Sequence, residues 1–255
     1  MKINYATTHR WRKEVVSDPL CLFGASEKKK ITDTLKKVPE SGVVYTIKPL
    51  DEEFLNWWCP IYEANISTKE NPKVFNVKEK TLGNNGKEKA YFSLTLNEGI
   101  DRLGGLIFSL KGDTLFFAYR TLAYDWKRSQ LRASPSLFVE YVIAEHAREI
   151  GMKQISHGLD RNPYGLNSSI GLAGFKLSTG CRPQLSEKFE VSIIDTQELD
   201  KNALILELPK EPTEHANITK AYLVADRAGI EKWSSLLKYD DRLVVEVIEK
   251  GGDIG

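Results

Sequence analysis

Cysteine is scarce in this chain of 255 residues, and no two cysteines form a C-x-x-C pair. Cys21, Cys59 and Cys181 are odd in number and widely spaced. This pattern argues against a disulfide scaffold and against a cysteine-based zinc site, so we expect no metal. It is typical of proteins in a reducing compartment, and we therefore expect a cytoplasmic location.

Long apolar runs are also missing, and so is an excess of charge of either sign. The N-terminal segment is polar, with His9, Arg10, Arg12 and Lys13, and it lacks the apolar stretch of a signal peptide. No apolar run approaches the length that crosses a bilayer, so we expect no membrane span. The formal net charge of +1 does not favour broad electrostatic capture of nucleic acid or of an anionic membrane.

Several catalytic and nucleotide-binding motifs are absent as well. The sequence has no G-x-S-x-G turn, no phosphate-binding P-loop and no G-x-G-x-x-G dinucleotide motif. No cysteine has an obvious histidine partner in the sequence. These absences give no support to covalent catalysis by a serine or cysteine, or to a conventional nucleotide-binding loop.

The composition is that of a globular protein with a substantial core, with 41% hydrophobic and 28% charged residues. From residue 43, periodicity predicts a strand, a helix that Asp51 can cap, and a polar segment with an Asn84-Asn85-Gly86 turn. Three strands joined by short turns, a helix, a strand and a short helix follow. The predicted strands cover residues 43–47, 90–96, 103–110, 114–123 and 153–157. Antiparallel strands that lead into a β-α-β unit predict an α/β fold with a mixed sheet.

Residues 135–180 carry the most specific pattern. Pro135 suits the first turn of a helix, and Gly151 suits its end. A short strand then leads into the polar turn 157–162, which begins at His157. The segment closes with Gly174-Phe175-Lys176 and, four residues later, Gly180. In α/β enzymes, ligands often bind where a strand ends in such a turn.

This segment resembles the second half of a GNAT-type acyltransferase domain. It is most similar to the GNAT-like branch that includes the Fem-type aminoacyl transferases, in which a Phe-Lys pair is followed by a glycine, as in Phe175-Lys176…Gly180. The resemblance implies a GNAT-like domain at residues 43–195, with an N-terminal extension at 1–42 and a C-terminal extension at 196–255. Beyond Gly180, the pattern predicts further strands at 189–194, 203–208 and 243–248 and a helix at 228–237.

The resemblance also implies catalytic residues. A neutral imidazole at His157 could take a proton from an attacking amine, with Asp160 to orient it. Lys176 could stabilise negative charge on a phosphate or an oxyanion. Tyr119 could give a proton to a leaving thiolate. The alternatives are a histidine satisfied by backbone groups, a helix-terminal lysine and an aromatic residue of the core.

In GNAT enzymes the pyrophosphate of coenzyme A is held at the start of the helix after the fourth strand. Here Gln130-x-x-Ala133-x-Pro135 lacks the usual glycines, and Pro135 removes one N–H donor. Cationic side chains beside the helix start could replace those donors, and the alternative is an exposed basic turn. The residues expected to contact the coenzyme are Arg128, Gln130, Arg132, Ala133, Ser134 and Ser136.

The function implied is transfer of an acyl group from an acyl-CoA-type thioester to an amine of a small molecule, such as an amino sugar, an amino acid or a cell-envelope precursor. The expected acceptor contacts are Arg120, Tyr124, Asp125, Arg161 and Tyr164. Two alternatives stay open. One is a Fem-like transferase that uses aminoacyl-tRNA, which the near-neutral charge does not favour. The other is a GNAT-shaped binding module without catalysis.

Overall fold

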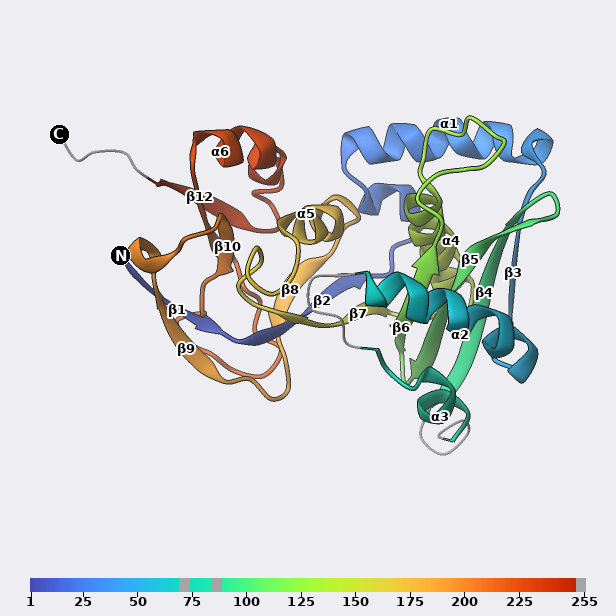
Figure 1. The fold of residues 1–255 in the computed structure, drawn as a ribbon, viewed down its shortest axis with the longest axis horizontal. Coiled ribbons are helices and arrows are strands. Elements are labelled where there is room, and N and C mark those ends of the chain that lie inside the picture. The colour runs from blue at the N-terminus through green and yellow to red at the C-terminus, as the bar shows by residue number, and fades with distance from the viewer. Residues whose placement is uncertain (69–73, 84–88, 251–255) are drawn as a thin grey trace. The chain divides into compact units, whose positions relative to one another are not determined.

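The predicted order of strands and helices is present in the computed structural model, which describes residues 1–68, 74–83 and 89–250 (Figure 1). The described chain forms two compact units. The first unit is Glu14–His157, and the second unit is Met1–Lys13 together with the chain from Gly158. The predicted turn at 84–86 and the C-terminal tail at 251–255 lie outside the described residues.

The first unit is a mixed sheet with helices on its faces. After a short 3-10 helix (Pro19–Leu22), its elements are α1 (Ala25–Ser41), β3 (Val43–Pro49), α2 (Glu52–Ser67), α3 (Val77–Leu82), β4 (Ala90–Glu98), β5 (Asp101–Lys111), β6 (Thr114–Leu122), α4 (Pro135–Glu149) and the start of β7 (Gln154–Arg161). Strands β3 to β6 pair antiparallel in sequence order. Strand β7 pairs parallel to β6, which confirms the predicted mixed α/β sheet.

The pairing of β6 with β7 is short. It joins Thr114–Phe117 to Gln154–His157, whereas β6 runs on to Leu122. His157 is therefore the last residue of β7 in this register. This parallel pair, with the helix α4 between its strands in the sequence, is the arrangement that the GNAT resemblance implies.

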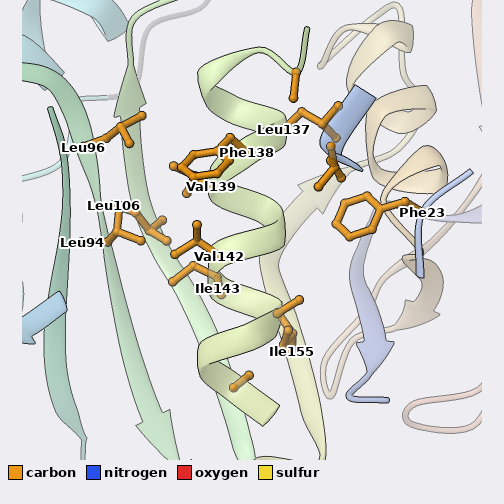
Figure 2. Packing of buried hydrophobic residues seen from close by; sticks show 14 of the residues in the cluster. Phe23, Leu94, Leu96, Leu106, Leu137, Phe138, Val139, Val142, Ile143 and Ile155 are labelled. Carbon is orange, nitrogen blue, oxygen red and sulfur yellow. The ribbon is translucent and has the colours of Figure 1, made fainter. Parts of the chain in front are cut away.

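The two faces of the sheet bury different helices because side chains alternate along each strand. Leu94 and Leu106 face α4, where Phe138 and Val142 pack against them (Figure 2). Ile107, the neighbour of Leu106, belongs instead to the cluster formed with α2 and α3. Each fully buried side chain of this size contributes about 1.5–3 kcal/mol to folding. Burial of these side chains therefore determines on which face of the sheet each side chain of β6 and β7 lies.

The helix ends follow the local sequence. Asp51 accepts a hydrogen bond from the Phe54 N–H at 2.8 Å, which confirms it as the cap of α2. Pro60 lies inside α2, which runs through it as one helix of 16 residues. Ser134 caps α4, and Gly151, with φ of 74°, follows its end. No helix in the described part of the chain is long and apolar enough to cross a membrane.

The second unit contains β1 (Lys2–Ala6), β2 (Thr8–Glu14), α5 (Ile170–Ser178), β8 (Arg182–Leu185), β9 (Val191–Asp195), β10 (Ala203–Leu206), β11 (Lys220–Ala225), α6 (Arg227–Trp233) and β12 (Val244–Glu249). Strands β10 and β11 are antiparallel, β11 and β12 are parallel, and β1 pairs with β9. Strands β2 and β7 each continue from one unit into the other. The predicted domain of residues 43–195 includes residues of both units, and its limits stay a prediction.

Candidate functional site

His157 lies buried where the pairing of β6 with β7 ends. Its ring stacks on Phe117, with 4.2 Å between ring centroids and 18° between the planes. Its Nε2 lies 3.4 Å from Oε2 of Glu140 on α4. Ile155, two residues earlier, packs in the core beneath α4, so the alternation of β7 directs His157 towards the same helix.

Glu140 has no exposed surface, and its other oxygen, Oε1, accepts a hydrogen bond from Nη1 of Arg120 at 2.9 Å. A buried carboxylate is tolerated when cationic or hydrogen-bonding partners surround it. We call Phe117, Arg120, Glu140 and His157 the His157 group. It places an imidazole beside a fixed carboxylate, an arrangement that can orient the ring and stabilise its charged form.

Tyr119 lies on the other face of the sheet. Its ring contacts Tyr62 and Phe75, with centroids 5.8 and 6.1 Å apart, in the cluster of α2 and α3. Burial raises the pKa of its hydroxyl. The structure therefore does not bring Tyr119 to His157, because a β-bulge in β6 between Phe117 and Tyr119 shifts the alternation and turns Tyr119 to the other face. Its role as a proton donor stays a prediction.

Asp160, Tyr164 and Lys176 meet in the second unit. Lys176 donates to Oδ2 of Asp160 at 2.6 Å, and the Tyr164 hydroxyl donates to the same oxygen at 2.7 Å. The Tyr164 oxygen accepts a hydrogen bond from Nε1 of Trp11 at 2.6 Å and lies 2.8 Å from Nε2 of His9. We call these five residues the Tyr164 network. Asp160 was expected to orient His157, but its partners are Tyr164 and Lys176, and the carboxylate beside His157 is Glu140.

The charges of this network follow from its burial. Burial lowers the pKa of His9 to about 3, so its ring is neutral near pH 7. Because the Tyr164 proton goes to Asp160, Nε2 of His9 must carry a proton and donate it. Burial raises the pKa of Asp160, but the charge and hydrogen bond of Lys176 outweigh it, and the net pKa is below the usual value. Burial and the Asp160 charge raise the pKa of Tyr164 well above 10.

Sequence reasoning missed His9, Trp11 and Glu140. His9, Trp11 and Lys13 alternate as the buried side chains of β2, but two of the three are polar, so the sequence lacks the apolar alternation that marks a strand. Nothing local marks Glu140, which lies among apolar residues on α4 and is identified only by its distant partners.

The turn predicted to hold coenzyme A is tied to the protein by its own contacts. Arg132 pairs with Asp33 at 2.6 Å, and the Ala133 N–H donates to Oγ1 of Thr34 at 2.9 Å. Ser134 uses its hydroxyl to cap α4, accepting from the Leu137 N–H at 3.3 Å. Gln130 is exposed, and Ser136 lies half-buried in the first turn of α4.

The backbone of this turn is also engaged. Oε2 of Glu98 accepts hydrogen bonds from the N–H groups of Lys127 at 2.7 Å and Arg128 at 3.1 Å, and Oε1 accepts one from the Ser129 N–H. Arg128 also pairs with Asp101, its Nη2 lying 2.8 Å from Oδ2. These backbone donors do not fit a pyrophosphate, because a carboxylate of the chain itself already uses them.

The expected acceptor contacts are in different surroundings. Tyr124 is 91% exposed, and Asp125 and Arg161 are also exposed. Arg120 holds Glu140, and Tyr164 is fully buried in its network. Among the residues that the structure describes, no group of three or more His, Cys, Asp or Glu side chains is placed to hold a metal ion.

Comparison with known proteins finds solved structures that are similar to this chain. No protein-family model matches the chain, and no curated protein matches it. FemX is similar over 69% of this chain and 59% of its own, with 14% identity and a TM-score of 0.49. The C-terminal domain (DUF2156) of a putative lysylphosphatidylglycerol synthetase from Agrobacterium fabrum is similar over 76% of this chain and 62% of its own, with 10% identity and a TM-score of 0.48.

A tandem GNAT protein from the clavulanic acid biosynthesis pathway is similar over 75% of this chain and 53% of its own, with 11% identity and a TM-score of 0.43. The chain thus spans about three fifths of the length of FemX and of the Agrobacterium domain. The strand order β3 to β6, the helix α4 and the parallel strand β7 form the mixed α/β sheet and the β-α-β unit that the sequence predicted.

Proposed function

We propose that this protein is an N-acyltransferase that moves an acyl group from an acyl-CoA-type thioester to an amine of a small molecule. The observation that supports this most is the buried His157 beside Glu140, at the end of the parallel pairing in a GNAT-like sheet. All three cysteines are free in the structure, as expected for a protein that acts in the reducing cytoplasm.

In this reaction the amine nitrogen attacks the carbonyl carbon of the donor directly. An N–C bond forms, the C–S bond breaks, and the thiolate leaves. His157 takes the proton that the amine loses, and Glu140 stabilises the imidazolium while Arg120 keeps Glu140 in place. A positioned base of this kind contributes about 10²- to 10⁴-fold to the rate, in addition to the gain from holding both substrates together.

Side chains are the available contacts for donor phosphates. Arg128 and Arg132 are each more than half exposed and pair with Asp101 and Asp33. Exposed ion pairs are worth at most about 1 kcal/mol, so each arginine could exchange its aspartate for a phosphate. For the acceptor, Asp125 is an exposed carboxylate that could attract an ammonium group. The proposal gives no chemical step to Tyr119 or Lys176, whose predicted roles the same assay can test.

The experiment measures thiol release from acyl-CoAs of several chain lengths in the presence of amino sugars and amino acids. We expect release that depends on the amine, and a loss of about 10²-fold or more in the His157→Gln variant. His146→Gln is the matched control, because His146 lies on α4 in the same unit and contacts Phe108 instead. Absence of release with every donor, or equal rates for both variants, would exclude the proposal.

A second candidate is a transferase that takes its group from aminoacyl-tRNA. The occupied backbone donors at 127–129 favour it, since such a donor needs no pyrophosphate there. The net charge of +1 argues against it, because gripping tRNA requires many phosphate contacts. It predicts tRNA binding that falls steeply with salt, and a filter-binding titration at rising ionic strength decides the question. Binding of neither donor would favour the module without catalysis.

A further inference from the structure

Three consecutive backbone N–H groups converge on one anion in the first unit. The donors belong to Lys127, Arg128 and Ser129, and the acceptor is the carboxylate of Glu98 at the end of β4. Successive N–H groups that point to one centre form a nest, the backbone arrangement by which proteins bind phosphate and other oxoanions. Glu98 is 1% exposed, so its carboxylate fills the nest without solvent access.

We infer that the 127–129 turn is an oxoanion-binding nest whose anion is supplied by the chain, with the Glu98 carboxylate in the place of a phosphate. Charge-assisted hydrogen bonds of this kind are about twice as strong as neutral ones. They also hold the carboxylate in its ionised form. Burial raises the pKa of Glu98, but the hydrogen bonds from Ser129, Lys127 and Arg128 outweigh it, and the net pKa is lowered.

The cations beside the nest are held by the same hairpin. Asp101, which faces Glu98 across the β4–β5 pairing, lies 3.6 Å from Nζ of Lys127 and 2.8 Å from Nη2 of Arg128. At the turn of the hairpin, Glu98 on β4 therefore satisfies the backbone donors, and Asp101 on β5 satisfies the cationic side chains. An incoming phosphate would have to displace a buried carboxylate, and like charges at such short distance repel strongly.

The alternative is that Glu98 only fastens the turn. The two possibilities differ in what happens when the carboxylate is removed. If Glu98 only fastens the turn, removal of its carboxylate should loosen the turn without creating a site that binds a ligand. A filled nest predicts that the vacated N–H groups, with Lys127 and Arg128 beside them, bind an external oxoanion.

The test is calorimetric titration of inorganic pyrophosphate into the wild-type protein and the Glu98→Ala variant. We expect at least a tenfold gain in affinity in Glu98→Ala. The control is Asp101→Ala, which frees the same two cations but leaves the nest filled, and it should gain less than Glu98→Ala. Equal affinity of wild type and Glu98→Ala, or an equal gain in both variants, would overturn the inference.

A second measurement needs no variant. In a pH titration of the wild type followed by NMR, the chemical shifts of the Glu98 carboxyl carbon and of the amide protons of residues 127–129 should change together. The midpoint of this change should lie at a lower pH than that of an ordinary glutamate. A Glu98 carboxyl that titrates at the ordinary value, or amides that do not respond, would overturn the inference even if Glu98→Ala does not fold. Neither measurement requires transfer activity, so failure of the acyltransferase assay leaves this result decisive.

Discussion

Glu140 is a charged side chain with no exposed surface, and two partners from neighbouring strands offset the free energy of its burial. Arg120 on β6 lies 2.9 Å from one oxygen and His157 on β7 lies 3.4 Å from the other. Loss of one member of such a group leaves the others without compensation in a place that water does not reach. Single substitutions here should therefore affect both stability and the proposed chemistry.

Glu140→Gln should lower the free energy of unfolding by about 1–3 kcal/mol, because Arg120 and His157 lose a charged partner. Urea denaturation measures the change. Glu145→Gln on the same helix removes an exposed ion pair with Arg148 and should cost less than about 1 kcal/mol. Equal losses in the two variants would mean that the buried carboxylate has no special role.

Tyr164→Phe should also destabilise the protein, by about 2 kcal/mol or more, since it removes one acceptor for Trp11 and His9 and one donor to Asp160. Tyr124→Phe is the matched control, because Tyr124 is 91% exposed and should change the free energy of unfolding by less than about 0.5 kcal/mol. A Tyr164→Phe protein as stable as this control would show that the network contributes nothing.

His9 gives the protein a pH dependence whose sign follows from its burial. Its pKa is about 3 in the folded chain and about 6.5 in the unfolded chain, so the unfolded chain binds the extra proton between these values. Stability should therefore fall as the pH falls below about 6.5, with up to about 1.4 kcal/mol per pH unit from this residue. In His9→Gln this contribution disappears. Chemical denaturation at several pH values between 7 and 4 measures the free energy of unfolding of both proteins. If this free energy changes with pH by the same amount in both, His9 is not buried in its neutral form.

At the scale of elements, α4 connects the sheet to the candidate site, and its start depends on a cap. Ser134→Ala should lower the free energy of unfolding by about 1 kcal/mol, because the Leu137 N–H loses its acceptor. Ser136→Ala, two residues further into the helix, should change it by no more than a few tenths of a kcal/mol. Thermal unfolding followed by circular dichroism compares the two, and equal melting temperatures would argue against the cap.

The sequence predicted these elements where local signals agree. Pro135 and Gly151 mark the ends of α4, and glycine-containing turns separate β4, β5 and β6. The strands β1 and β2 were missed, since β2 buries His9 and Lys13 on its inner face and so hides the usual contrast of apolar and polar residues. The contact of Glu98 with residues 127–129 joins positions about thirty residues apart, and no local pattern records it.

At the scale of the whole molecule, the second unit is built from both ends of the sequence. The Tyr164 network joins residues 155 positions apart in the case of His9 and 153 in the case of Trp11. The resemblance implies boundaries near 42 and 195, which stay a prediction, and contacts of this range leave no trace in local composition. His157, the candidate base, was predicted from its position at the end of a strand. Its partner Glu140 can be identified only from the packed structure.

In the proposed function, an acyl group moves to an amine at the His157 group. Mass spectrometry of the acceptor after incubation with a ¹³C-labelled acyl-CoA measures this directly. We expect an amine heavier by the labelled acyl group with the wild-type protein, and about 10²-fold or more less product with His157→Gln, which must remain folded by its melting temperature. An unlabelled acceptor with every donor and amine tried, or equal labelling by His157→Gln, would contradict the claim.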